Sequence, residues 1–255
     1  MSDLSVSHQD GVAIVTLNRP DTRNSVTYAM WQGLGDVFGE LSENREVKSV
    51  ILHGAGDDFS VGADIAEFAK VRDDTEQAVA YEVAVDYGCA GITNAAKPVI
   101  AVNTGYCLGG GAHLAMSCDF RFAHTDALFG IPAANLSIVY GVQGTRKLLA
   151  LVGLTEAKRI LYSGKRFDAP HALDIGFVDR VSHDPMAAAL EFAASLTTSA
   201  PLTMAGAKYI LNGSALDRFD PAEADRLINT ASASADYREG RTAFAEKRPP
   251  QFTGA

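Results

Sequence analysis

An uninterrupted apolar run, Pro98 to Val102, limits the folds open to this chain more than any other segment. A strand of this kind, without alternation of polar and apolar residues, is typical of a sheet covered on both faces. The run leads to three consecutive glycines, Gly109–Gly111, and then to a helical pattern that ends near Cys118. The sequence therefore predicts a buried strand, a glycine corner and a helix, in that order.

Strand and helix patterns alternate along residues 1–180. Strands are expected over 11–18, 47–56 and 120–124, and helices over 26–41, 75–96, 156–164 and 169–176. A segment that passes from loop to helix is expected over 57–71. This alternation implies an α/β fold with crossover connections.

The end of the chain, from about Pro185, has helical patterns only. We therefore divide the chain into an α/β body, residues 1–184, and a helical C-terminal region, residues 185–255. That region is too short and too apolar to stand alone, so we expect it to pack on its own body or on a neighbouring subunit.

Composition excludes several classes of function. The net charge is −9 at pH 7 and no block of like charges stands out, which argues against a nucleic-acid partner. The longest uncharged run, between Lys97 and Asp119, contains proline and four glycines and is poor material for a membrane span. The start of the chain lacks the basic and apolar segments of a signal peptide. Cys89, Cys107 and Cys118 are an odd number without zinc-ligand spacing, so a cytoplasmic protein with reduced thiols and no metal is expected.

The glycine corner has the arrangement of a site for a negatively charged oxygen, because the first amides of a helix lack partners within the chain. It has no Gly-Lys-Ser/Thr ending as in a P-loop, and its glycines do not fit the dinucleotide fingerprint. The remaining interpretation is that the glycine corner supplies one amide donor of an oxyanion hole. A second corner, "FSVGADIAEF" around Gly62–Asp64, offers the other donor. The alternative is that both corners are tight turns that allow a helix to pack closely on a strand.

Five segments, in order, resemble the enoyl-CoA hydratase/isomerase (crotonase) superfamily: "LNRPDTRNSV", "FSVGADIAEF", "GYCLGGGAHLAMSCDFRFA", "HALDIGFVDRV" and "EGRTAFAEKRPPQF". The resemblance covers nearly the whole chain. It implies a crotonase-like spiral of ββα turns with a helical C-terminal trimerisation region, assembled as a homotrimer or homohexamer.

The resemblance also implies a site. In it the main-chain amides of Ala63 and Gly110 hold the carbonyl oxygen of an acyl-CoA thioester. Further substrate contacts are implied for Arg23, Ser25, Asp64, Ile65 and Ala66. Coenzyme A then enters as part of the substrate, and no separate cofactor is implied.

The chain departs from the hydratase pattern at both catalytic glutamates, whose positions hold His113 and Ala133. His113 lies in the first turn of the expected helix, where the helix dipole keeps an imidazole neutral. A neutral ring can accept or relay a proton; the alternative is a hydrogen-bonded wall residue. Tyr140 is the second candidate catalytic residue, because "PAANLSIVYGVQG" is similar to methylmalonyl-CoA decarboxylase. That match is partial, since the decarboxylase has a histidine where Ala63 stands, and the alternative for Tyr140 is an ordinary pocket-lining aromatic.

Other carboxylates receive structural interpretations. Asp64 is expected to cap the helix that begins at Ile65. Glu82 and Asp86 lie on a helical stretch that borders the acyl pocket in relatives. Either could offer a carboxylate there, but for both a solvated helix face is the favoured interpretation.

Three functions follow from these observations. The first is an enzyme of the hydratase/isomerase group that stabilises a thioester enolate. The second is a decarboxylase, or a C–C or thioester hydrolase, that uses Tyr140 or His113. The third is a protein that binds acyl-CoA without chemistry.

Overall fold

A computed structural model, which describes residues 2–255, contains a six-stranded sheet in the order β1-β2-β3-β4-β6-β9. Its strands are β1 (Leu4–Gln9), β2 (Val12–Leu17), β3 (Ser49–Gly54), β4 (Val99–Asn103), β6 (Phe120–His124) and β9 (Arg180–Ser182). β1 pairs antiparallel with β2, and all other neighbours are parallel, with Ile51 beside Ile100 in the central pair. The parallel order requires the crossovers that the sequence predicts.

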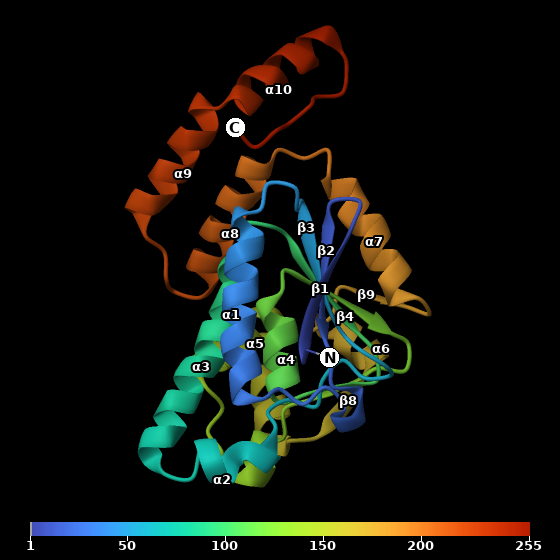
Figure 1. The fold of residues 1–255 in the computed structure, drawn as a ribbon, viewed down its shortest axis with the longest axis vertical. Helices are drawn as coiled ribbons and strands as arrows, with labels where there is room; N and C mark the ends of the chain where they lie inside the picture. Colours follow the sequence, from blue (N-terminus) through green and yellow to red (C-terminus); the bar gives the residue numbers. More distant parts are fainter. Residues whose placement is uncertain (1) are drawn as a thin grey trace.

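The central strand β4 is buried along its whole length, which confirms the prediction for Pro98–Val102. Val99 and Ala101 face one hydrophobic cluster, whereas Ile100 and Val102 face a second. The first cluster is covered by α1 (Tyr28–Glu43), α3 (Thr75–Asn94) and α4 (Gly110–Ser117), and the second by α7 (Pro185–Leu196). In Figure 1, α1, α3 and α4 lie on one side of the sheet and α7 on the other.

A second, three-stranded sheet has the order β5-β7-β8. It consists of β5 (Tyr106–Leu108), β7 (Leu128–Gly130) and β8 (Arg166–Asp168). These strands have three residues each, too few for a sequence pattern to reveal them. Because β5 leads directly to Gly109 and the start of α4, this small sheet positions the glycine corner.

The remaining short elements surround that corner: η1 (Pro20–Thr22), η2 (Ile65–Glu67), α2 (Phe68–Val71), η3 (Pro132–Leu136) and α6 (Ala169–Asp174). The helix expected from residue 156 is the second part of a longer one, α5 (Val142–Ser163), which is interrupted at Gly153 with φ +73° and ψ 173°. β1 lacks a clear pattern because it is an edge strand whose residues are almost all exposed.

The C-terminal region contains α7, α8 (Pro201–Ala215), α9 (Pro221–Ala233) and α10 (Ala235–Glu246). Figure 1 shows α9 and α10 standing away from the sheet. The division at residue 184 stays a prediction, and α7, the first helix beyond it, packs directly on the sheet. Within residues 2–255, no helix combines the length and apolarity needed to cross a membrane.

Candidate active site

The two glycine corners lie side by side because the loop before Ala63 runs along β5. The Ser60 amide donates to the Tyr106 carbonyl oxygen at 2.9 Å, and the Leu108 amide donates to the Ser60 carbonyl oxygen at 2.9 Å. Ser60 and Cys107 thus form a parallel bridge. These hydrogen bonds hold the loop before Ala63 in register with β5 up to Leu108, the residue before Gly109.

The glycines at these corners are required by close backbone approach. Gly62 has φ +94°, and a Cβ added there would lie 2.7 Å from the Gly110 nitrogen. A Cβ added at Gly110 would lie 3.1 Å from the Ala63 nitrogen and 3.0 Å from Cζ2 of Trp31. Real Cβ atoms essentially never make a contact as short as the one at Gly62, and the contacts at Gly110 are tighter than most, so a side chain at either site would push its neighbours aside.

Both amides predicted for the oxyanion hole are available from the backbone arrangement. The Val26 amide donates to the Gly62 carbonyl oxygen at 2.8 Å, and the Asp64 amide to the Val26 carbonyl oxygen at 3.0 Å. Since successive N–H groups of extended backbone point to opposite sides, the Ala63 N–H points away from Val26. Gly110 is the first residue of α4, so its N–H has no partner within the helix. The binding of an oxygen between these two donors stays a proposal.

Ala63 and Gly110 line one cavity of about 140 Å³. Its wall is largely apolar and includes residues from α1, α2, α3, η3 and the loop that follows it, such as Trp31, Phe68, Val85, Ile131, Ala133 and Ile138. Besides Tyr81, the wall contains four polar or ionisable side chains: Arg72, Glu82, His113 and Tyr140. A cavity of this kind suits an apolar group attached to one polar reacting centre.

His113 is buried, and its Nε2 has no hydrogen-bond partner among the described residues. Burial lowers the pKa of His113 well below 6.5, and the nearby Lys147 ammonium lowers it further. The ring is therefore neutral at pH 7, as the sequence predicts. The alternative of a hydrogen-bonded wall histidine is not supported for Nε2, and the catalytic role itself stays a prediction.

Tyr140 lies beside His113, with 5.9 Å between the ring centroids. Its hydroxyl donates to the Gly109 carbonyl oxygen at 3.0 Å. Burial raises the pKa of Tyr140 well above 10, so the phenol is neutral. The hydroxyl holds the loop that presents Gly110, and a catalytic role for it stays a prediction.

Glu82 and Asp86 differ although both lie on α3. Asp86 is exposed and does not line the cavity, as expected for a solvated helix face. For Glu82 that interpretation holds only in part: 42% of its side chain is exposed, but it also lines the cavity and pairs with Arg72 at 2.8 Å. Burial raises the pKa of Glu82, and the Arg72 guanidinium opposes this rise.

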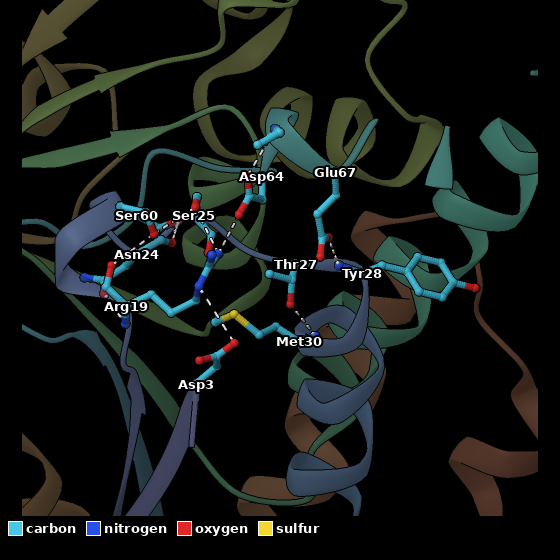
Figure 2. A network of polar contacts seen from close by, with 12 residues as sticks. Asp3, Arg19, Asn24, Ser25, Thr27, Tyr28, Met30, Ser60, Asp64 and Glu67 are labelled. Carbon is cyan, nitrogen blue, oxygen red and sulfur yellow. Dashed lines mark hydrogen bonds and ion pairs between the residues drawn. The ribbon is translucent and has the colours of Figure 1, made fainter. Parts of the chain in front are cut away.

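Arg19, which the sequence interpretation missed, is the centre of the network in Figure 2. Its Nη1 donates to the Asp64 carboxylate at 2.7 Å and to the Ser25 carbonyl oxygen at 2.7 Å. Asp64 also accepts from the Ala66 amide at 3.1 Å, which confirms it as the cap of the turn that begins at Ile65. Arg19 thereby ties the segment before α1 to the loop that carries Ala63. Its place before Pro20, in the first resembling segment, was the available signal.

The predicted substrate-contacting residues lie in three different places. Ala63, Ile65 and Gly110 line the cavity. Ser25 is buried, and its hydroxyl accepts from Arg19 at 3.0 Å, so it belongs to the network rather than to the cavity wall. Arg23 is exposed outside the cavity, 3.7 Å from the Asp58 carboxylate.

No group of three or more His, Cys, Asp or Glu side chains within residues 2–255 is arranged to hold a metal ion. The three cysteines are buried and unpaired. Burial raises the pKa of Cys89 to about 11, which makes this thiol unreactive. The cavity therefore depends on main-chain amides and on the four side chains named above.

The chain is similar to known proteins along nearly its whole length. A family model described as enoyl-CoA hydratase/isomerase matches residues 7–255. The chain is 33% identical to the short-chain-enoyl-CoA hydratase of Clostridium acetobutylicum, over 97% of this chain and 96% of that protein. It is 32% identical to the 2,3-dehydroadipyl-CoA hydratase of Escherichia coli, over 100% of both. The crystal structure of an enoyl-CoA hydratase/carnithine racemase from Magnetospirillum magneticum superimposes with a TM-score of 0.91 at 34% identity, covering 100% of this chain and 97% of that one.

Proposed function

The chain belongs to the enoyl-CoA hydratase/isomerase family, and from that premise we propose that it binds an acyl-CoA thioester in this cavity and stabilises its enolate. The observation that carries the proposal is the approach of the two corners, with the Ala63 nitrogen 3.1 Å from a Cβ placed on Gly110. An enolate places negative charge on the thioester oxygen. Each preorganised donor at such an oxygen is worth about 10²–10³ in rate.

The acyl group would occupy the apolar cavity, and the coenzyme A portion would extend past the exposed residues Ile65 and Ala66. Arg23 lies outside the cavity, 3.7 Å from the Asp58 carboxylate, and 59% of its side chain is exposed, so in this proposal it contacts the phosphate groups. Coenzyme A is part of the substrate in this proposal, and no separate cofactor is required.

Hydration or isomerisation of an enoyl-CoA is the nominal reaction, as in the named relatives. A second candidate is decarboxylation, and the observation that favours it is the identity of two wall residues. His113 and Ala133 line the cavity at the positions where the family resemblance places glutamates. Loss of CO₂ from an α-carboxyl thioester generates the enolate without a base, and Tyr140 or His113 could orient that carboxyl group.

Parallel incubations with crotonyl-CoA and methylmalonyl-CoA test these candidates. Loss of the enoyl absorbance would support hydration, and CO₂ release that disappears in Tyr140→Phe would support decarboxylation. Isothermal titration with butyryl-CoA tests the binding that all of them require. Binding without turnover of a broad panel would indicate a non-catalytic acyl-CoA-binding protein, and absence of binding would contradict the proposal.

His113→Ala is expected to lower kcat on the best substrate of that panel at least about fivefold. The reason is that a neutral ring with a free Nε2 relays a proton through a hydrogen bond made in the transition state, and one such bond is worth about 1 kcal/mol or more. His8→Ala, on the exposed edge strand β1, is the matched control. Full activity of His113→Ala would assign the ring a structural role only.

The helical C-terminal region supports a further part of the proposal, assembly as a homotrimer or homohexamer. Helices α9 and α10 stand away from the sheet and expose Ile228, Tyr237 and Phe244, the last with 88% of its surface accessible. Apolar surface of this kind is stabilised when a neighbouring copy covers it. A light-scattering mass of three or six chains is expected, and the mass of a single chain would contradict this part.

A further inference from the structure

The cavity contains a carboxylate to which the family resemblance assigns no catalytic role. Glu82, on α3, lines the same cavity as Ala63 and Gly110. Its Oε1 accepts from Arg72 Nη2 at 2.8 Å. Within residues 2–255, Oε2 takes part in no hydrogen bond and lies 3.3 Å from the place of a Cβ on Gly141. The absence of a side chain at Gly141 therefore leaves room for this oxygen.

Arg72 fixes the carboxylate without using its second oxygen. The guanidinium lies over the ring of Phe68, 5.2 Å from its centroid, and 5.6 Å from that of Tyr81. Its side chain is only 17% exposed, so the ion pair is held in one position by packing as well as by charge. One Glu82 oxygen is thus anchored while the other is free to exchange a proton.

The other two candidates in the wall are less suited to take a proton from carbon. The Tyr140 hydroxyl donates to the Gly109 carbonyl oxygen, and burial keeps this phenol neutral. Burial also lowers the pKa of His113 well below 6.5, which disfavours the imidazolium that proton uptake would create. Burial has the opposite effect on Glu82, whose pKa it raises, making the carboxylate a stronger base.

We infer that Glu82 is the catalytic base of this cavity and takes the α-proton of a bound acyl-CoA thioester on Oε2. This inference rests on the proposed function, since the thioester must bind with its oxygen at Ala63 and Gly110. The α C–H bond breaks, its proton forms the O–H bond of the Glu82 carboxylic acid, and its electron pair forms the carbon–carbon double bond of the enolate. The carbonyl π electrons move to the oxygen at the two amides. Return of a proton from Glu82 completes the exchange, and no oxidant or other reactant is needed.

The partial exposure of Glu82, 42% of its side chain, makes the step measurable. In D₂O the carboxylic acid exchanges its proton with solvent and returns a deuteron to the α-carbon. Mass spectrometry of butyryl-CoA incubated with the full-length protein in D₂O therefore reports the step with a saturated substrate, whatever the overall reaction is.

Glu82→Gln keeps an acceptor for Arg72 but removes the base, so we expect α-deuteration to fall about 10²–10⁴-fold. The dissociation constant for butyryl-CoA should change little in the same variant. Glu76→Gln, in the exposed first turn of α3, is the matched control and should exchange at the wild-type rate.

The outcomes separate the inference from the proposal beneath it. Wild-type protein that binds butyryl-CoA without deuterating it, or Glu82→Gln that deuterates it at the wild-type rate, would overturn the role of Glu82 alone. An equal loss in Glu76→Gln would overturn it too. Absence of butyryl-CoA binding to the wild type would overturn both the proposed function and the inference.

Discussion

Gly110→Val is expected to lower kcat/KM for an acyl-CoA thioester by about 10²–10³-fold while the protein remains folded. The added Cβ would lie 3.0 Å from Cζ2 of Trp31 and 3.1 Å from the Ala63 nitrogen. Trp31 cannot move aside easily, because it is fully buried and its Nε1 donates to the Tyr81 hydroxyl at 3.0 Å. The valine methyls would therefore separate the two corners and occupy the space where the thioester oxygen would bind.

The fold should tolerate this change because Gly110, unlike Gly109, does not have a positive φ. Gly39→Val is the matched control: Gly39 lies on α1, and a Cβ there meets no atom within 4 Å. Both variants should give wild-type circular dichroism, and steady-state kinetics should separate them. Wild-type kinetics of Gly110→Val would refute the oxyanion assignment.

Lys208→Met is expected to destabilise the protein by about 3–5 kcal/mol, since it leaves a buried carboxylate without its cation. Lys208 on α8 contacts Asp119 at 2.7 Å, and their side chains are 10% and 17% exposed. The same ammonium donates to the Lys97 carbonyl oxygen at 3.1 Å, so it also joins the C-terminal region to the body. Urea unfolding of Lys158→Met, an exposed lysine on α5, provides the control and should differ from wild type by less than about 0.5 kcal/mol.

The loss of stability in Lys208→Met should also depend on pH. Burial raises the pKa of Asp119, and Lys208 opposes this rise. Without the lysine the folded-state pKa rises further, so the folded state binds more protons than the unfolded state and stability falls as pH increases between the two pKa values. The difference from wild type should therefore be smaller at pH 5 than at pH 8. An equal loss at both values would indicate that the charge of Asp119 is not the cause.

The sequence predicts those parts of the fold that depend on local patterns. The run Pro98–Val102 identifies β4, because a strand covered on both faces needs an apolar residue at every position. The glycines identify the two corners, because only glycine tolerates the backbone contacts and the positive φ found there. The helices expected over 75–96 and from Pro185 onward follow from their spacing.

The elements and roles that depend on distant contacts could not be predicted in this way. The three-residue strand β5 becomes a strand only because β7 pairs with it. The helical segment of α5 before the kink at Gly153 was not predicted either. The sequence pattern indicates a surface residue at Glu82, because the cavity that Glu82 lines is completed by distant segments, α2 and the loop after η3. Its partner Arg72 follows the end of α2, outside α3, so the sequence alone gives no sign that the pair meets at the cavity.

A crystal structure of the protein with butyryl-CoA tests the central claim most directly. The account predicts the thioester oxygen within about 2.7–3.1 Å of both main-chain nitrogens, those of Ala63 and Gly110. A thioester oxygen bound away from either nitrogen, with the acyl chain outside the cavity, would contradict it.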